Sequence, residues 1–201
     1  HLFGTEFRAT ATTTMILLLV FNRPDHTRQV FEQVRRVRPA QLFVSADGPR
    51  AHVPADAEKC AAVRAIFDEV DWPCAVHTNF LSENHGCRRA VQAGISWFFE
   101  NVEAGIILED DCLPDLSFFD FCTDMLERYR DDTEVLQISG NNPVPAACRS
   151  VASSYVFSRY SFIWGWATWR RAWKLYDADF TDLEKMWQDP TSGLSQLSPD
   201  P

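Results

Sequence analysis

The feature that most constrains the fold is an unbroken apolar segment, Met15–Phe21, with the sequence MILLLVF. A run of this length is typical of a strand that is buried on both faces, as in a parallel sheet. Asn22 and Arg23 follow as a loop, with Pro24 placed to begin a helix that ends at Pro39. The folded part of the chain therefore begins as a strand–loop–helix unit.

The same alternation continues along the chain. Further strands are predicted at residues 41–46, 74–80, 105–108 and 135–139, and further helices at 57–70, 88–101 and 114–129. This order predicts an α/β fold with an open, mostly parallel sheet flanked by helices. After residue 150 we expect a strand at 155–157 and a helix entered from the Trp-rich segment 164–173, in which Trp166, Trp169 and Trp173 would share one face.

We expect a single domain over residues 15–190. Residues 1–14 carry no apolar periodicity and are interpreted as a disordered leader or tag remnant, and residues 191–201 as a flexible tail. No stretch reaches the roughly 18 apolar residues of a membrane span. The six Cys residues form no CxxC pair, and in a chain of this size they are expected to be reduced, buried thiols.

Polar clusters follow four of the predicted strands or their loops. They are Asn22-Arg23, Asp47-Gly48, Asn84-His85-Gly86 and Glu109-Asp110-Asp111. Open α/β sheets bind ligands outside the carboxyl ends of their strands, so these clusters predict one binding site. The net charge of −9 argues against a nucleic-acid partner.

Three consecutive carboxylates at positions 109–111 repel one another and destabilise the fold unless something compensates their charge. A divalent cation does so, because Mg²⁺ and Mn²⁺ favour carboxylates together with substrate phosphates. The alternative is that Asp110, Asp111 and Asp115 only cap the following helix.

Three segments resemble those of a known family. Gly105–Phe119 (GIILEDDCLPDLSFF) resembles the metal-binding region of GT-A-fold glycosyltransferases, especially the N-acetylglucosaminyltransferase I type. Asn84–Ala90 is similar to the N-x-G-x-x-x-A stretch of family-2-type enzymes, and Leu18–Pro24 to their first strand and nucleotide loop. The similarity covers roughly residues 15–176 and implies a Rossmann-like nucleotide-diphospho-sugar transferase fold.

The resemblance implies roles for eight residues. They are Asp111 as ligand of Mn²⁺ or Mg²⁺, Asp110 and Glu109 on the sugar or ribose, Asp47 on the nucleobase, Asn22 and Arg23 in the nucleotide pocket, Arg88 (or Arg89) at the diphosphate, and Trp166 on the donor sugar. Each has a structural alternative: a turn at Asp47, a helix cap at Asn22, a solvated helix face at Arg88 and core packing at Trp166.

The resemblance implies a metal-dependent, inverting transferase that moves a sugar from a nucleotide-diphosphate donor, with UDP favoured, to a glycan or glycolipid acceptor in cell-surface polysaccharide synthesis. We expect a cytoplasmic enzyme, with the membrane surface reached through a partner. Two alternatives stay open: a sugar nucleotidyltransferase, which would carry a Gly-rich basic loop after the first strand, and a non-catalytic nucleotide-sugar- or carbohydrate-binding module.

Such a transferase needs a general base. The acidic residues after the Trp-rich segment lack the aromatic-acidic pattern of similar enzymes; they are Asp177, Asp179, Asp182 and Glu184. We therefore expect the base to lie beyond this chain, which would be truncated at its C-terminus.

Overall fold

The computed structural model describes residues 14–141, 154–181, 185 and 188. Its strands are β1 (Ile16–Val20), β2 (Gln41–Ala46), β3 (Ala75–Phe80), β4 (Ala104–Glu109), β5 (Ile138–Ser139) and β6 (Trp166–Trp169). Its helices are α1 (Pro24–Val37), α2 (Pro54–Ala65) with a 3₁₀ turn η1 (Ile66–Glu69), α3 (Cys87–Asn101), α4 (Leu116–Arg128) and the short α6 (Arg170–Trp173). The predicted leader, apart from Thr14, and the predicted tail lie outside the described residues.

The strands form one six-stranded sheet in the order β3-β2-β1-β4-β6-β5. β1 pairs in parallel with both β2 and β4, and β2 pairs in parallel with β3. β6 runs antiparallel to its neighbours β4 and β5. The predicted open, mostly parallel α/β sheet is confirmed.

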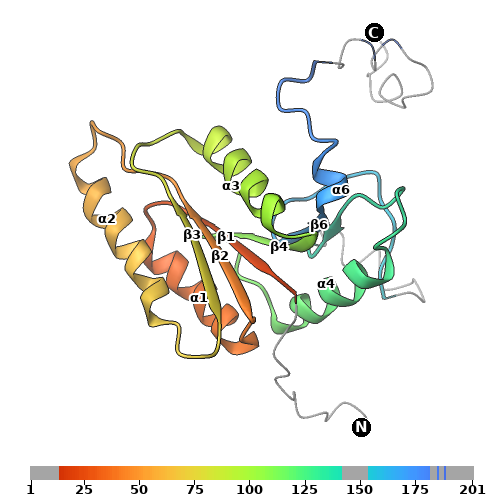
Figure 1. Ribbon diagram of the computed structural model, residues 1–201, viewed down its shortest axis with the longest axis horizontal. Helices are drawn as coiled ribbons and strands as arrows, with labels where there is room; N and C mark the ends of the chain where they lie inside the picture. Colours follow the sequence, from red (N-terminus) through yellow and green to blue (C-terminus); the bar gives the residue numbers. More distant parts are fainter. Residues whose placement is uncertain (1–13, 142–153, 182–184, 186–187, 189–201) are drawn as a thin grey trace.

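Helices cover both faces of the sheet (Figure 1). One face packs against α1, η1 and α4 through side chains such as Leu18, Phe31 and Phe119. The other packs against α3 through Leu17, Phe43 and other side chains of the second core cluster. Successive residues of β1 therefore enter different cores, which explains why this strand is apolar at every position.

The Trp-rich segment differs from the prediction, because Trp166–Trp169 is a strand and only Arg170–Trp173 is helical. Trp166 and Trp169 consequently lie on opposite faces of the sheet: Trp166 packs on the α3 side and Trp169 on the α4 side. The shared helical face predicted for them is wrong. Residues 155–157 form no strand, and the predicted strand 135–139 is reduced to its last two residues.

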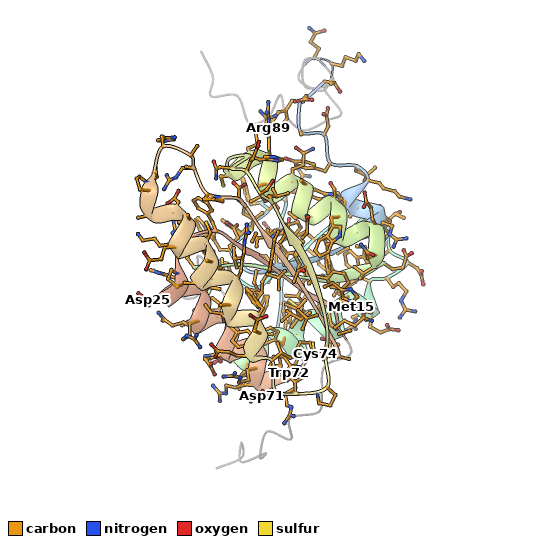
Figure 2. All side chains as sticks on the ribbon, turned by 60° about the vertical axis from the view of Figure 1, so that its left-hand side comes forward. Met15, Asp25, Asp71, Trp72, Cys74 and Arg89 are labelled. Atoms are coloured by element: carbon orange, nitrogen blue, oxygen red, sulfur yellow. The ribbon has the colours of Figure 1, made fainter. Side chains whose placement is uncertain are left out.

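The amino and carboxyl ends of the parallel strands lie at opposite ends of the molecule. Figure 2 shows Trp72 and Cys74, which precede β3, at one end of the molecule and Arg89, in the first turn of α3, at the other. The end marked by Arg89 is the carboxyl edge of the parallel strands, where the site is built.

Five cysteines are described, and all are free thiols. Cys60 and Cys122 are buried, as predicted, but Cys87 is exposed, and Cys148 lies outside the described residues. No helix in the described part of the chain is long and apolar enough to cross a membrane.

Candidate functional site

Four loops meet at the carboxyl edge of the sheet. They follow β1, β2, β3 and β4, which are adjacent, parallel strands. From β1 the chain passes through α1 to β2 on one side, whereas β4 lies on the other side of β1 and follows α3. The carboxyl ends of β1 and β4 therefore flank the point where the strand order reverses, the usual ligand crevice of such sheets.

The acidic triplet lies in this crevice and is joined across it by Arg23. Glu109 is the last residue of β4 and is paired in register with Leu19 of β1. Arg23 Nη1 donates to Asp111 Oδ2 at 2.8 Å and to Asp110 Oδ1 at 3.4 Å. The side chain of Asp110 is 11% exposed and that of Asp111 is 49% exposed, so the triplet has an inner and an outer carboxylate.

Burial raises the pKa of two carboxyl groups of the triplet, Glu109 and Asp110. It raises the pKa of Glu109, and the charges of Asp111 and Asp110 raise it further. Burial also raises the pKa of Asp110, while the guanidinium of Arg23 opposes that increase. The guanidinium of Arg23 faces three carboxyl groups, so the triplet favours the approach of a further positive charge.

The donor chemistry of the triplet suits a hard divalent cation. Among the residues that the structure describes, no three His, Cys, Asp or Glu side chains converge closely enough to hold a metal ion by themselves. Mg²⁺-type sites for phosphate substrates need only one or two protein carboxylates, since phosphate and water supply the other ligands. The half-exposed Asp111 fits such a role.

Asp47, at the end of β2, is buried and binds the loop that follows β3. Its Oδ1 accepts hydrogen bonds from the amides of Gly48 and His85, both at 2.8 Å, and its Oδ2 from Asn84 Nδ2 at 2.9 Å and the Gly86 amide at 3.1 Å. A carboxylate offers about four acceptor positions, and all four are used. Asp47 thus fixes this loop, and its contact with a nucleobase stays a prediction.

Gly48 allows the same two loops to touch. A Cβ atom on this residue would lie 2.4 Å from the backbone of Glu83. Arg64 of α2 adds a further bridge, because its Nη2 donates to the carbonyl oxygens of Asp47 at 3.3 Å and Leu81 at 2.6 Å. The loops after β2 and β3 therefore form one rigid unit.

Asn22 and Arg23 follow β1 directly, but their side chains have different partners. Asn22 does not cap α1 with its side chain; its Nδ2 donates to Asp56 Oδ1 at 2.8 Å. Asp56, in the first turn of α2, also binds Arg50. Neither Asp56 nor Arg50 could be recognised from the sequence, because an acid in a first helical turn and an arginine after a turn are ordinary local features.

A groove extends from the triplet past residues of α3, α4 and β6. Its lining includes Arg88, Glu109, Asp111, Trp164 and Trp166, and among the predicted site residues Asn22, Arg23, Asp47 and Asp110 lie outside it. Trp166 is only 9% exposed and packs mainly in the core, whereas Trp164 is 66% exposed. Trp164 and Trp166 therefore both line the groove, and Trp164 is the more exposed of the two.

Arg88, in the first turn of α3, lies at the rim of this groove and is exposed. It donates to the carbonyl oxygen of Ala178, and its Nη2 lies 3.3 Å from Asp179 Oδ1. Arg88 and the triplet thus line one groove, but no hydrogen bond or ion pair joins them among the described residues.

The acidic candidates for a general base are poorly suited to that role where they are described. Hydrogen bonds from Thr181 hold the pKa of Asp177 below its ordinary value, which makes it a weaker base. Asp179 pairs with Arg88. Asp182 and Glu184 lie outside the described residues.

Comparison with known proteins finds likenesses among solved structures alone. No family model matches the chain, and no curated protein matches it. Among solved structures it is similar to the mannosyltransferase PcManGT from Pyrobaculum calidifontis in complex with GDP-Man and Mn²⁺, with 15% sequence identity and a TM-score of 0.46. The match covers 65% of this chain and 36% of that one, so this chain spans well under two thirds of the length of that enzyme.

Proposed function

We propose that this chain is the donor-binding part of a glycosyltransferase, which moves a sugar from a nucleotide diphosphate to an acceptor hydroxyl. The observation that carries the proposal is the acidic triplet at the crevice between β1 and β4, joined by Arg23. An acidic site can bind an anionic diphosphate only if cations mediate the contact. Arg23 supplies one positive charge, and a divalent metal ion, Mn²⁺ or Mg²⁺, supplies the other.

We propose a different role for each of the three acidic residues, according to how exposed its side chain is. Asp111, the outer carboxylate, holds the cation, which when bound stabilises negative charge on the leaving diphosphate. Asp110 is held by Arg23 and orients the inner end of the site. Glu109 lines the groove and accepts hydrogen bonds from ribose or sugar hydroxyls.

The nucleotide lies over the ends of β1 and β2 in this proposal. Asn22 and Arg23 contact it directly, and the loop that Asp47 fixes forms the adjoining wall. UDP is the nucleotide that we propose. Arg88 approaches the diphosphate from the groove rim, where an arginine fits phosphate oxygens well.

The groove receives the sugar and the acceptor. Its exposed aromatic residues, Trp164 and Tyr176 among them, suit the apolar faces of sugar rings, and the mostly buried Trp166 also lines it. We propose inversion at the anomeric carbon and a glycan or glycolipid acceptor of cell-surface polysaccharide synthesis, with the enzyme in the cytoplasm and brought to the membrane by a partner.

A non-catalytic nucleotide-sugar-binding module is the second candidate. It is favoured by the described base candidates, because the pKa of Asp177 is lowered and Asp179 is paired with Arg88. Release of free sugar from UDP-hexoses, assayed with Mn²⁺ and with a chelator, separates an enzyme from a module.

Calorimetric titration of UDP with Mn²⁺ tests the metal assignment. Asp111→Asn removes the exposed carboxylate, and we expect it to abolish Mn²⁺-dependent UDP binding. The control is Asp120→Asn, an exposed acid on α4, which should bind like the wild type. Unchanged affinity in Asp111→Asn would remove Asp111 as the metal ligand.

A further inference from the structure

We infer that Asp56 is a positioning residue of the nucleotide subsite and that Arg50, which it holds beside Asn22, is an additional nucleotide-binding residue. This inference rests on the proposed function, because it concerns the same donor site. It assigns an active role to two residues that no motif marks.

The carboxylate of Asp56 accepts four hydrogen bonds. Oδ1 accepts from Asn22 Nδ2 at 2.8 Å and from Arg50 Nη2 at 3.1 Å. Oδ2 accepts from Arg50 Nε at 2.5 Å and from the Arg50 backbone amide at 3.3 Å. Asp56 therefore ties together the loop after β1, the loop after β2 and the first turn of α2.

Asp56 is 1% exposed, and a buried carboxylate is stable only when it is paired and hydrogen-bonded. The hydrogen bonds from Arg50, and then that from Asn22, hold the pKa of Asp56 well below its usual range. The carboxylate consequently stays ionised and acts only as an acceptor at physiological pH.

This acceptor fixes the orientation of the Asn22 amide. The NH₂ group of Asn22 faces Asp56, so the carbonyl oxygen Oδ1 faces the other way. Asn22 thus presents an acceptor next to Arg23, at the crevice end of β1. A ribose hydroxyl or the imide N–H of a uracil ring is the donor that such an oxygen binds.

Asp56 also holds the guanidinium group of Arg50, but it binds only one edge of that group. Its Nε and Nη2 face Asp56, its guanidinium carbon lies 5.4 Å from the centroid of the Phe21 ring, and its side chain is 41% exposed. The remaining amino group, Nη1, and one face of the guanidinium are left for an anionic or carbonyl oxygen of the nucleotide. Holding both side chains before the ligand arrives removes an entropic cost of binding.

A mutant cycle on UDP affinity, measured with Mn²⁺ by calorimetry, tests this role. Asp56→Asn should weaken UDP binding by about tenfold or more, the equivalent of one lost hydrogen bond to a charged group. In an Asn22→Ala/Arg50→Ala background the same substitution should change the affinity by less than about twofold, because the residues through which it acts are gone. Glu58→Gln, an exposed acid two residues along α2, is the matched control and should bind like the wild type.

A loss of the same size in both backgrounds would overturn the positioning role. If Asp56→Asn does not fold, Asp56→Glu serves instead, since it keeps the charge but displaces Arg50, and the same non-additivity is expected. The Nε–H NMR signal of Arg50 in the UDP-free protein should be protected in the wild type and in Glu58→Gln and lost in Asp56→Asn; an unchanged signal would refute the clamp. A wild type that binds no UDP would refute the proposed function, whereas binding with additive losses would refute only the role of Asp56.

Discussion

At the scale of single residues, the site depends on buried carboxylates that bind backbone and side-chain donors. Asp47 and Asp56 each accept four hydrogen bonds, and both join loops that are distant in sequence. Among the described residues, Asp110 and Asp111 of the triplet instead pair with Arg23, so they retain capacity for a ligand. Carboxylates whose acceptor positions are all occupied therefore shape the site, whereas those of the triplet can still bind a ligand.

Asp47→Asn tests the first kind of residue. An amide in place of Oδ2 would face the NH₂ group of Asn84 and the amide of Gly86, which are both donors, so these would lose their acceptor. We expect a stability loss of about 1–3 kcal/mol, the cost of unsatisfied buried groups. In the ligand-free protein, hydrogen–deuterium exchange of the His85 and Gly86 amides should be faster.

The control for Asp47→Asn is Glu83→Gln, an exposed acid in the same loop, which should leave that exchange unchanged. Exchange at residues 85 and 86 that stays slow in Asp47→Asn would show that the loop holds its conformation without this carboxylate.

At the scale of elements, the apolar strands and the helices between them could be predicted from sequence because their pattern is local. Residues 16–20 alternate between two cores, and Thr27, Val30 and Val34 recur at helical spacing. Trp166–Trp169 could not be assigned in this way. All four of its residues are buried, and a short apolar segment with large side chains at i and i+3 fits a helix as well as a two-faced strand.

The site could be predicted in outline but not in its contacts. The carboxyl edge follows from parallel strands, and it brings Arg23 and the triplet together. The pairing of Asn22 with Asp56, 34 residues away, depends on how α2 packs, and no local pattern reports that. The difference in exposure between Trp164 and Trp166 likewise depends on tertiary packing that no local pattern reports.

The close contact of α3 with the sheet gives a prediction at this scale. A Cβ atom on Gly94 would lie 2.7 Å from Ser45 Oγ, 2.9 Å from Ser45 Cβ and 2.8 Å from Leu19 Cδ2. Leu19 can move, but Ser45 Cβ is fixed to β2. Gly94→Ala should therefore destabilise the fold by about 1–3 kcal/mol through overpacking, although alanine is the better helix former by about 1 kcal/mol.

Urea denaturation checks Gly94→Ala, with Ala93→Ser on the exposed side of the same turn as the control. A variant as stable as the wild type would mean that α3 can move away from the sheet. In that case Arg88 in the first turn of α3 should move too, and UDP affinity would report the shift.

At the scale of the whole molecule, the proposed function and the charge of the chain oppose each other. With a net charge of −9, an anionic donor approaches against an overall repulsion. The triplet adds three acids at the place where the diphosphate would lie. Such an arrangement favours ligand binding through a cation at a cost in the stability of the free protein.

Glu109→Gln measures that cost. Because burial and the neighbouring acids raise the pKa of Glu109 in the folded state, its ionised form destabilises the fold at neutral pH. The sign follows from linkage: the folded protein binds a proton more tightly than the unfolded chain, so this cost disappears as the pH falls from the raised pKa to the unfolded value near 4.5. Glu109→Gln should be more stable than the wild type at neutral pH, with a difference that shrinks on acidification, and its Mn²⁺-dependent UDP binding should be weaker.

Urea denaturation of both proteins at neutral pH and near pH 4.5, without ligand, measures the stability difference. A gain that persisted at low pH would come from packing, not charge. Lower stability than the wild type at neutral pH would mean that the ionised Glu109 is already compensated within the protein, and the argument for an added cation at the triplet would then lose its electrostatic basis.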